Sequence, residues 1–370
     1  MPSPQPGHRA ARTTVAALLL LGALAVLALG VARAARAPRP NTSDEPDEPD
    51  EPYGPERHRT ASDAPDGPGV RARFLRIDGV PLHVRTEGSG PPCLLTGGLG
   101  SSWFDWDLVV PFLTPYRTVV RFDRPGYGLS AAEPATGRPA PTTAGEADRI
   151  RAVLDGLGLR EPCTVVGHSL AGFHVEAFAR LHPERTAGLV LVDGSVEPAA
   201  RPYPAPAARD LAVRAVAGAA TALAVPYLLG PTVRRVTARL STVRHEDLAP
   251  EPLVRHCYRT GRALRAMLRE NARYLDLAAE LDGLRRTRPL PEDLPVTVLA
   301  ADDGCRTRRT ESWLAGQREL AALLGADFRT TAPAGHLVMF DRPDAVASAV
   351  LSQGAFRLSV RRQGLEPRTR

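Results

Sequence analysis

The stretch VVGHSLAG, residues 165–172, decides the fold. An apolar strand ends there in Gly-x-Ser, and apolar residues at helical spacing follow from Leu170 onward. A sharp strand-to-helix turn of this kind exposes the hydroxyl of Ser169 and points the amide of Leu170 toward a developing oxyanion. Ala171 stands where the usual Gly-x-Ser-x-Gly pattern has its second glycine, and alanine is small enough for the turn. The stretch therefore predicts a nucleophile at Ser169 and an oxyanion donor at Leu170.

Short apolar segments on both sides of this turn alternate with segments of helical spacing. Because these strand segments are largely apolar, we predict an α/β fold with a mostly parallel sheet, covered by helices on both faces. A helix is expected at 144–157, and strands are expected at 74–78, 80–85, 93–96, 118–122, 163–166, 189–192, 296–300 and 328–331.

Three motifs in this order resemble those of the α/β hydrolases, in the group of lipases, esterases and haloperoxidase-like enzymes. They are DRPGYGLS at 123–130, the turn at 167–172, and Gly-His at 335–336 followed by Asp-Arg-Pro at 341–343. The resemblance covers residues 73–351. It implies an α/β-hydrolase fold with a helical cap insertion, a serine hydrolase activity, and no cofactor or metal.

The resemblance also implies a base and a second oxyanion donor. His336 lies just past the last predicted strand, late in the chain, where the family has its catalytic histidine. The loop after the third strand usually begins His-Gly, and here it reads TGGL at 96–99. We expect the amide of Gly98 to be the second donor, although Thr96 replaces a side chain that normally braces this loop.

The triad acid is open to three interpretations. It must come from the loop after the seventh strand or from the end of the sixth, because only these reach the histidine. Counting from Ala301, which stands at the family's usual glycine, a loop shorter by one residue gives Asp303. We expect Asp303 to be the acid, with Asp193 at the end of the sixth strand as the alternative and Asp302 as the third candidate.

The predicted core, residues 70–195 and 295–356, is interrupted by a predicted helical cap at 196–294. An apolar run at 215–229 lies in this cap and is interrupted by Pro226. The run is too short to span a membrane, so we expect a cap helix over the active site. The alternative is an apolar cap that dips into a bilayer or admits apolar substrates.

The N-terminal segment 1–36 contains an unbroken apolar run at 15–32. Its length fits an uncleaved transmembrane anchor, and the alternative is a secretory signal cleaved near Ala34. Residues 37–69 are rich in Pro, Asp and Glu and predict a disordered linker. We therefore expect a single-pass membrane protein with an extracytoplasmic catalytic domain; residues 357–370 form an Arg-rich tail.

Composition disfavours two kinds of ligand, nucleic acid and zinc. The net charge is +6, yet every basic residue is an arginine and these are scattered along the chain, which disfavours nucleic acid as a partner. The four cysteines show no CxxC spacing, which disfavours a zinc site.

Hydrolysis of a small, apolar carboxylic ester through an acyl-enzyme is the favoured function. Epoxide hydrolases and haloalkane dehalogenases of this fold need Asp at the turn, where this chain has Ser169. Other serine-dependent activities stay open, namely C–C hydrolase, aminopeptidase and perhydrolase. So does a non-catalytic small-molecule receptor that keeps the pocket.

Overall fold

A computed structural model describes residues 71–133, 141–197 and 200–363. The predicted anchor at 1–36, the linker at 37–69 and the last seven residues of the predicted tail lie outside these ranges. Among the described residues, no single helix is both long and apolar enough to span a membrane.

The described residues form an eight-stranded sheet with the strand order β1-β2-β4-β3-β5-β6-β7-β8. Strand β2 pairs antiparallel with β4, and every pair from β4 to β8 is parallel. The predicted strands are all present, with ends shifted by at most three residues. The strands are β1 (Arg71–Ile77), β2 (Val80–Glu87), β3 (Pro92–Thr96), β4 (Thr118–Phe122), β5 (Cys163–His168), β6 (Thr186–Val192), β7 (Val296–Ala301) and β8 (Asp327–Thr331).

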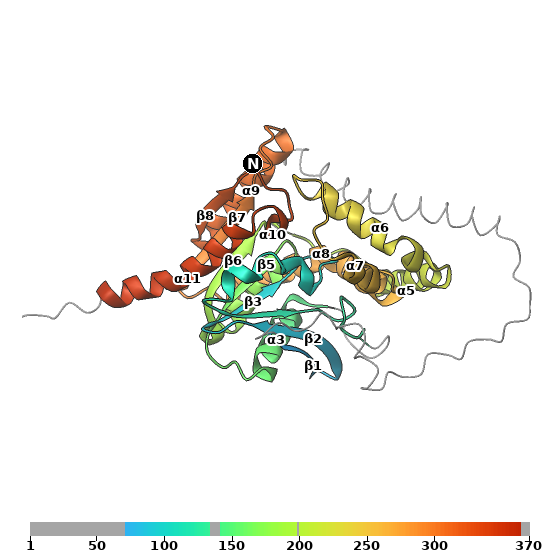
Figure 1. The fold of residues 1–370 in the computed structure, drawn as a ribbon, viewed down its shortest axis with the longest axis horizontal. Helices are drawn as coiled ribbons and strands as arrows, with labels where there is room; N and C mark the ends of the chain where they lie inside the picture. The colour runs from blue at the N-terminus through green and yellow to red at the C-terminus, as the bar shows by residue number, and fades with distance from the viewer. Residues whose placement is uncertain (1–70, 134–140, 198–199, 364–370) are drawn as a thin grey trace, which may run out of the picture. The chain divides into compact units, whose positions relative to one another are not determined.

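Both faces of the sheet are covered, as the apolar strands predict. Leu94 and Val165 point to one face, and their neighbours Leu95 and Val166 point to the other, each within a separate buried apolar cluster. The first cluster includes residues of α3 (Thr143–Gly156), α4 (Ala171–Leu181) and α9 (Arg308–Leu324). The second includes residues of η2 (Trp103–Trp106), α2 (Val110–Leu113), α10 (Val338–Asp341) and α11 (Pro343–Gln363). Figure 1 labels α3, α9, α10 and α11 around the strands. A short turn, η3 (Pro183–Arg185), precedes β6.

Four helices lie between β6 and β7 and form the cap: α5 (Pro206–Ala222), α6 (Val225–Leu240), α7 (Glu251–Tyr258) and α8 (Gly261–Thr287). Leu277 and Leu281 of α8 are buried in the first apolar cluster, so this helix joins the cap to the core. The cap also reaches the loop after β3, because the Tyr258 hydroxyl donates to the carbonyl of Gly100.

The apolar run at 215–229 does not form the single cap helix that we expected. Ala224 has a left-handed φ of 55°, and Pro226 lies in the first turn of α6. A proline fits the first turn of a helix, whereas inside a continuous helix over 215–229 Pro226 would remove a backbone hydrogen bond. The chain starts a new helix there, although α6 does accommodate a second proline, Pro231, in its interior. The two helices are bent by 103°, and only as a pair do they have the length and hydropathy of a membrane span.

Candidate active site

The turn between β5 and α4 holds Ser169 in a left-handed conformation, with a φ of 54°. Gly167 makes this possible, because a Cβ there would lie 2.5 Å from the Val175 side chain. Both the N–H and the carbonyl of Ser169 form backbone hydrogen bonds. Its N–H donates to the carbonyl of Val192 at 3.2 Å, and its carbonyl accepts from the N–H of Ser195 at 3.0 Å. The strained turn is therefore locked in place by the end of β6.

Ser169, His336 and Asp193 form a continuous hydrogen-bonded chain. The Ser169 Oγ lies 3.0 Å from His336 Nε2, and His336 Nδ1 lies 2.6 Å from Asp193 Oδ2. A carboxylate can only accept, so Nδ1 carries the proton and Nε2 is free to accept from the serine hydroxyl. This is the arrangement of a serine nucleophile with its general base.

Asp193 is buried and firmly oriented. Its Oδ1 accepts from the N–H of Ala301 at 2.9 Å and from Nε1 of Trp313 at 2.7 Å, which leaves Oδ2 for the histidine. Asp193 directly follows β6, and β6 pairs with both β5 and β7. Its carboxylate therefore lies beside the turn that carries Ser169.

The expectation that Asp303 orients the histidine is wrong. The Asp303 carboxylate is exposed and accepts from the N–H of Cys305 at 2.8 Å and from the hydroxyl of Thr310. Asp302, the third candidate, accepts from the N–H of Gly304. Both side chains are used in the tight turn after β7, which faces solvent, so neither reaches His336.

The two predicted oxyanion donors are the N–H groups of Gly98, in a loop that approaches Ser169, and of Leu170, the next residue in the chain. A Cβ on Gly98 would lie 2.8 Å from the Ser169 Cβ and 3.2 Å from its Oγ, so only glycine lets the loop approach this closely. Within the described residues, the N–H groups of Gly98 and Leu170 donate to no protein acceptor. They are therefore available to an oxyanion that forms at Ser169.

Arg124 braces the loop of Gly98, a role that sequence reasoning missed. Its guanidinium donates to the carbonyls of Gly97 and Gly98, the latter at 2.8 Å, and approaches the Thr96 hydroxyl at 3.4 Å. The stretch DRPGYGLS was recognised as a motif without a role for its arginine. Arg124 supplies support to a loop in which Thr96 replaces the usual histidine.

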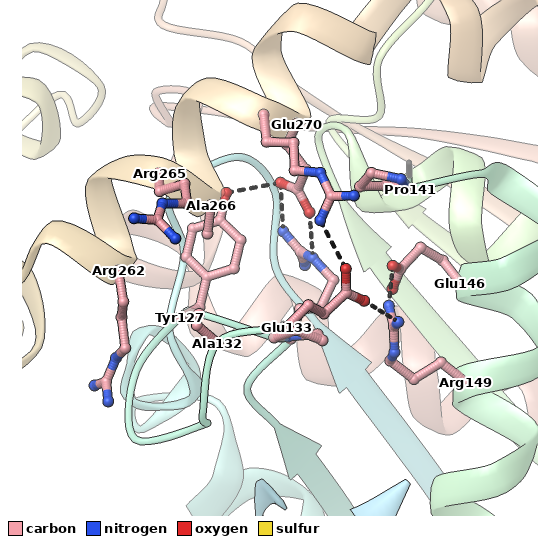
Figure 2. A pocket seen from close by; sticks show the side chains of 14 residues that line it. Tyr127, Ala132, Glu133, Pro141, Glu146, Arg149, Arg262, Arg265, Ala266 and Glu270 are labelled. Carbon is pink, nitrogen blue, oxygen red and sulfur yellow. Dashed lines mark hydrogen bonds and ion pairs between the residues drawn. The ribbon is translucent and has the colours of Figure 1, made fainter. Parts of the chain in front are cut away.

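Glu270 of helix α8 holds Arg124. Its carboxylate accepts from Arg124 Nε at 2.7 Å and from Nη2 at 3.0 Å, and also from the Tyr127 hydroxyl at 2.9 Å. Burial is the largest single influence on the pKa of Arg124 and lowers it. The charge and hydrogen bonds of Glu270, together with Tyr127 and Glu146, outweigh burial and leave this pKa raised. Figure 2 shows Glu270 reaching from its helix toward Tyr127. Both residues line a small cavity of about 50 Å³, together with Glu133 and Arg149. A cap helix thus helps to position the predicted oxyanion loop.

We expect Glu270→Gln to lower kcat for ester hydrolysis by about 10- to 100-fold, less than or similar to the loss of one oxyanion donor. Glutamine keeps the size but leaves the Arg124 charge buried without its partner, so the loop carbonyls lose their fixed support. The control is Glu133→Gln, since Glu133 pairs with Arg149 and Arg269 in the same cavity but does not touch the loop. Both variants are assayed well below their melting temperatures, and equal kcat values in the two would contradict the role.

His168 supports the histidine loop from the other side. Its Nε2 lies 2.8 Å from the backbone carbonyl of His336, and the two rings are 4.6 Å apart. Burial, together with the neighbouring His336, holds the pKa of His168 well below its usual range. The ring is therefore neutral and donates its Nε2 proton to that carbonyl, which fixes the backbone of His336.

No group of three or more His, Cys, Asp or Glu side chains in the described ranges could hold a metal ion. Three of the cysteines are buried, Cys305 is exposed, and none is in a disulfide.

Comparison with known proteins identifies the family. Residues 93–349 match the model of the alpha/beta hydrolase family. The chain belongs to that family.

Its similarity to individual members is partial. It is 32% identical over 136 residues to the 2-hydroxymuconate semialdehyde hydrolase of Pseudomonas sp. (strain CF600), which is 35% of this chain and 46% of that protein. It is 33% identical over 117 residues to the soluble epoxide hydrolase of Corynebacterium sp. (strain C12), which is 32% of this chain and 39% of that protein.

The chain thus covers less than half the length of these relatives. Among solved structures, wild-type Cfl2 from Burkholderia cenocepacia matches 77% of this alpha/beta hydrolase and 95% of its own chain, with a TM-score of 0.59 and 23% identity. At that identity, the likeness concerns the fold. The hydrolase names among the sequence relatives support an enzyme.

Proposed function

We propose that this alpha/beta hydrolase is a serine hydrolase that cleaves carboxylic esters through an acyl-enzyme on Ser169. The observation that carries the proposal is the hydrogen-bonded chain from Ser169 through His336 to Asp193. It lies beside two N–H groups, of Gly98 and Leu170, that donate to no protein acceptor in the described part of the chain.

The geometry supports a two-step reaction. His336 Nε2 takes the proton from the Ser169 hydroxyl as Oγ attacks the ester carbonyl, and the N–H groups of Gly98 and Leu170 stabilise the tetrahedral oxyanion. The imidazolium then gives its proton to the leaving alcohol. Water, activated by the same nitrogen, hydrolyses the acyl-enzyme. Throughout, Asp193 holds the ring orientation and stabilises its positive charge.

The turn residue separates this proposal from epoxide hydrolysis. The epoxide hydrolases of this fold attack with a carboxylate at the position that Ser169 occupies here, so likeness to a soluble epoxide hydrolase does not carry that activity over. C–C bond hydrolysis is the second candidate function, because it uses the same serine chemistry and one partial relative is named for a semialdehyde hydrolase. A non-catalytic receptor is less favoured, because Asp193 is hydrogen-bonded to His336 and Arg124 is hydrogen-bonded to the loop of Gly98.

The full-length protein, purified in mild detergent, is expected to react with a fluorophosphonate probe and to hydrolyse short p-nitrophenyl esters. A phosphonylated peptide that contains Ser169 would support the nucleophile, because the probe reacts only with an activated serine. Absence of both labelling and turnover would favour the receptor. Labelling without ester turnover would direct the search toward C–C substrates.

We also propose that the apolar run at 15–32 anchors the protein in a membrane with its catalytic domain on the extracytoplasmic side. The anchor rests on the length and unbroken apolar character of that run, and the extracytoplasmic side rests on the Pro-, Asp- and Glu-rich stretch at 37–69, whose composition suits a stalk. Mass spectrometry of the native N-terminus is the test. A chain that retains the run and stays in the membrane fraction is expected, and a chain starting at Ala35 would show cleavage and overturn the anchor.

A further inference from the structure

Helices α5 and α6, with the residues that flank α5, carry most of the exposed large apolar side chains in the described part of the chain. Nine of the fourteen lie between residues 203 and 240, namely Tyr203, Leu211, Val216, Leu223, Tyr227, Leu228, Val233, Val236 and Leu240. Leu240 is 78% exposed and Leu211 is 63% exposed. An exposed apolar patch of this size on one pair of helices is unusual for a surface that contacts only solvent.

The exposed residues follow the helical repeat. On α5, Ala212, Val216, Ala219 and Leu223 have the spacing i, i+4, i+7 and i+11, and all four are exposed. Val233, Val236 and Leu240 continue the same spacing on α6. Helix α5 buries only the small side chains Ala217 and Ala220. Each helix therefore turns a continuous apolar stripe outward instead of into the protein.

The charged residues of the α5–α6 pair are mostly basic. Residues 206–240 contain five arginines and a single acid, Asp210. That acid is already paired with Arg273 of α8 at 2.6 Å. Three of the arginines are paired with acids, namely Arg209 with Asp276, Arg234 with Asp105 and Arg235 with Glu251. Arg214 and Arg239 are exposed; Arg239 lies beside the stripe of α6, and Arg214 lies on the side of α5 opposite its stripe. Long arginine side chains can cover apolar surface with their stems while the guanidinium reaches toward phosphate.

From these observations, we propose that the α5–α6 pair is a membrane-contacting surface that lies in the headgroup region of an anionic bilayer. Exposed apolar stripes on helices whose charged residues are mostly arginines are the pattern of helices that lie in the plane of a membrane interface. The 17 residues of α5 span about 25 Å, and the 103° bend with its arginines favours lying in the interface over crossing it. Tyr203 and Tyr227, both about half exposed, suit the headgroup level.

The C-terminal end of α6 contacts the segment that carries His336. Helix α6 ends at Leu240, and the carbonyl of the next residue, Ser241, accepts from the N–H of Leu337 at 2.9 Å. Leu337 follows His336 in the chain. A bilayer under α6 would therefore be close to the active site. Membrane contact by the cap does not depend on the catalytic assignment, and it is a second contact besides the proposed N-terminal anchor.

Site-directed fluorescence in the full-length protein tests the surface. Cys305→Ser removes the exposed native thiol, and Val216→Cys, Val236→Cys and Leu323→Cys then each accept an environment-sensitive dye. Leu323 is the matched control, because it is an apolar residue on α9 with 63% exposure and lies outside the cap. Each protein is reconstituted into vesicles of phosphatidylcholine with phosphatidylglycerol that contain nitroxide-labelled lipid.

The expected result is quenching of the dyes at 216 and 236 by at least about twofold more than at 323, with less quenching in phosphatidylcholine alone. Adding Arg214→Glu and Arg239→Glu should also reduce it. Equal, weak quenching at all three positions would overturn the proposal. So would dyes at 216 and 236 that are shielded from water but unquenched, because a protein surface, either the N-terminal segment or a second copy, would then cover the stripes.

Discussion

Ser169→Ala is expected to abolish ester hydrolysis while the protein stays folded. The alanine removes the attacking oxygen but keeps the Cβ that packs against Gly98, so the turn and the loop opposite it retain their contacts. Because the triad acts as a unit, the loss should be about five to six orders of magnitude in kcat, and His336→Ala should lose a similar amount. The measurement is turnover of p-nitrophenyl butyrate by full-length protein, together with the melting temperature.

Ser352→Ala is the matched control for this variant. Its hydroxyl donates to the carbonyl of Ala349 within α11, away from the site, so activity and probe labelling should be unchanged. An alanine variant at 169 that hydrolyses the ester as fast as the parent would remove Ser169 from the mechanism. Residual labelling of that variant at another serine would point to a different nucleophile.

Asp193→Asn is expected to cost about four orders of magnitude in kcat with little change in fold, by comparison with other triads. The surroundings determine which way the new amide points. Two donors, the N–H of Ala301 and Nε1 of Trp313, require the asparagine oxygen. Its NH₂ group must then face His336 Nδ1, which favours the tautomer that cannot take a proton from Ser169.

Asp303→Asn is the matched control for the acid, because Asp303 is the acid expected from the sequence and lies in an exposed turn. It should keep the activity of the parent. The reverse pattern, an inactive 303 variant and an active 193 variant, would mean that the hydrogen bond to His336 does not act in catalysis. Unchanged melting temperatures in both variants are required, so that lost activity is not mistaken for lost fold.

The sequence by itself determined the features that depend on neighbouring residues. The turn at Ser169 needs an apolar strand, small residues at 167 and 171, and a helix, and all of these lie within one short stretch. The positions of the central strands β3, β5, β6 and β7 followed from apolar runs for the same reason, because a strand buried on both faces is apolar along most of its length. His336 was found by its place after the last strand.

Only the tertiary structure decided between the acids. Asp193 and Asp303 each follow a strand, and their local sequences do not distinguish them. The pairing of β6 with β5 and β7 places Asp193 beside Ser169, whereas the turn after β7 uses Asp303 in its own hydrogen bonds. The support of Gly98 by Arg124 and Glu270 could not be predicted from the sequence either, because 146 residues separate Arg124 from Glu270. Such contacts depend on how distant segments pack, and local patterns carry no record of that packing.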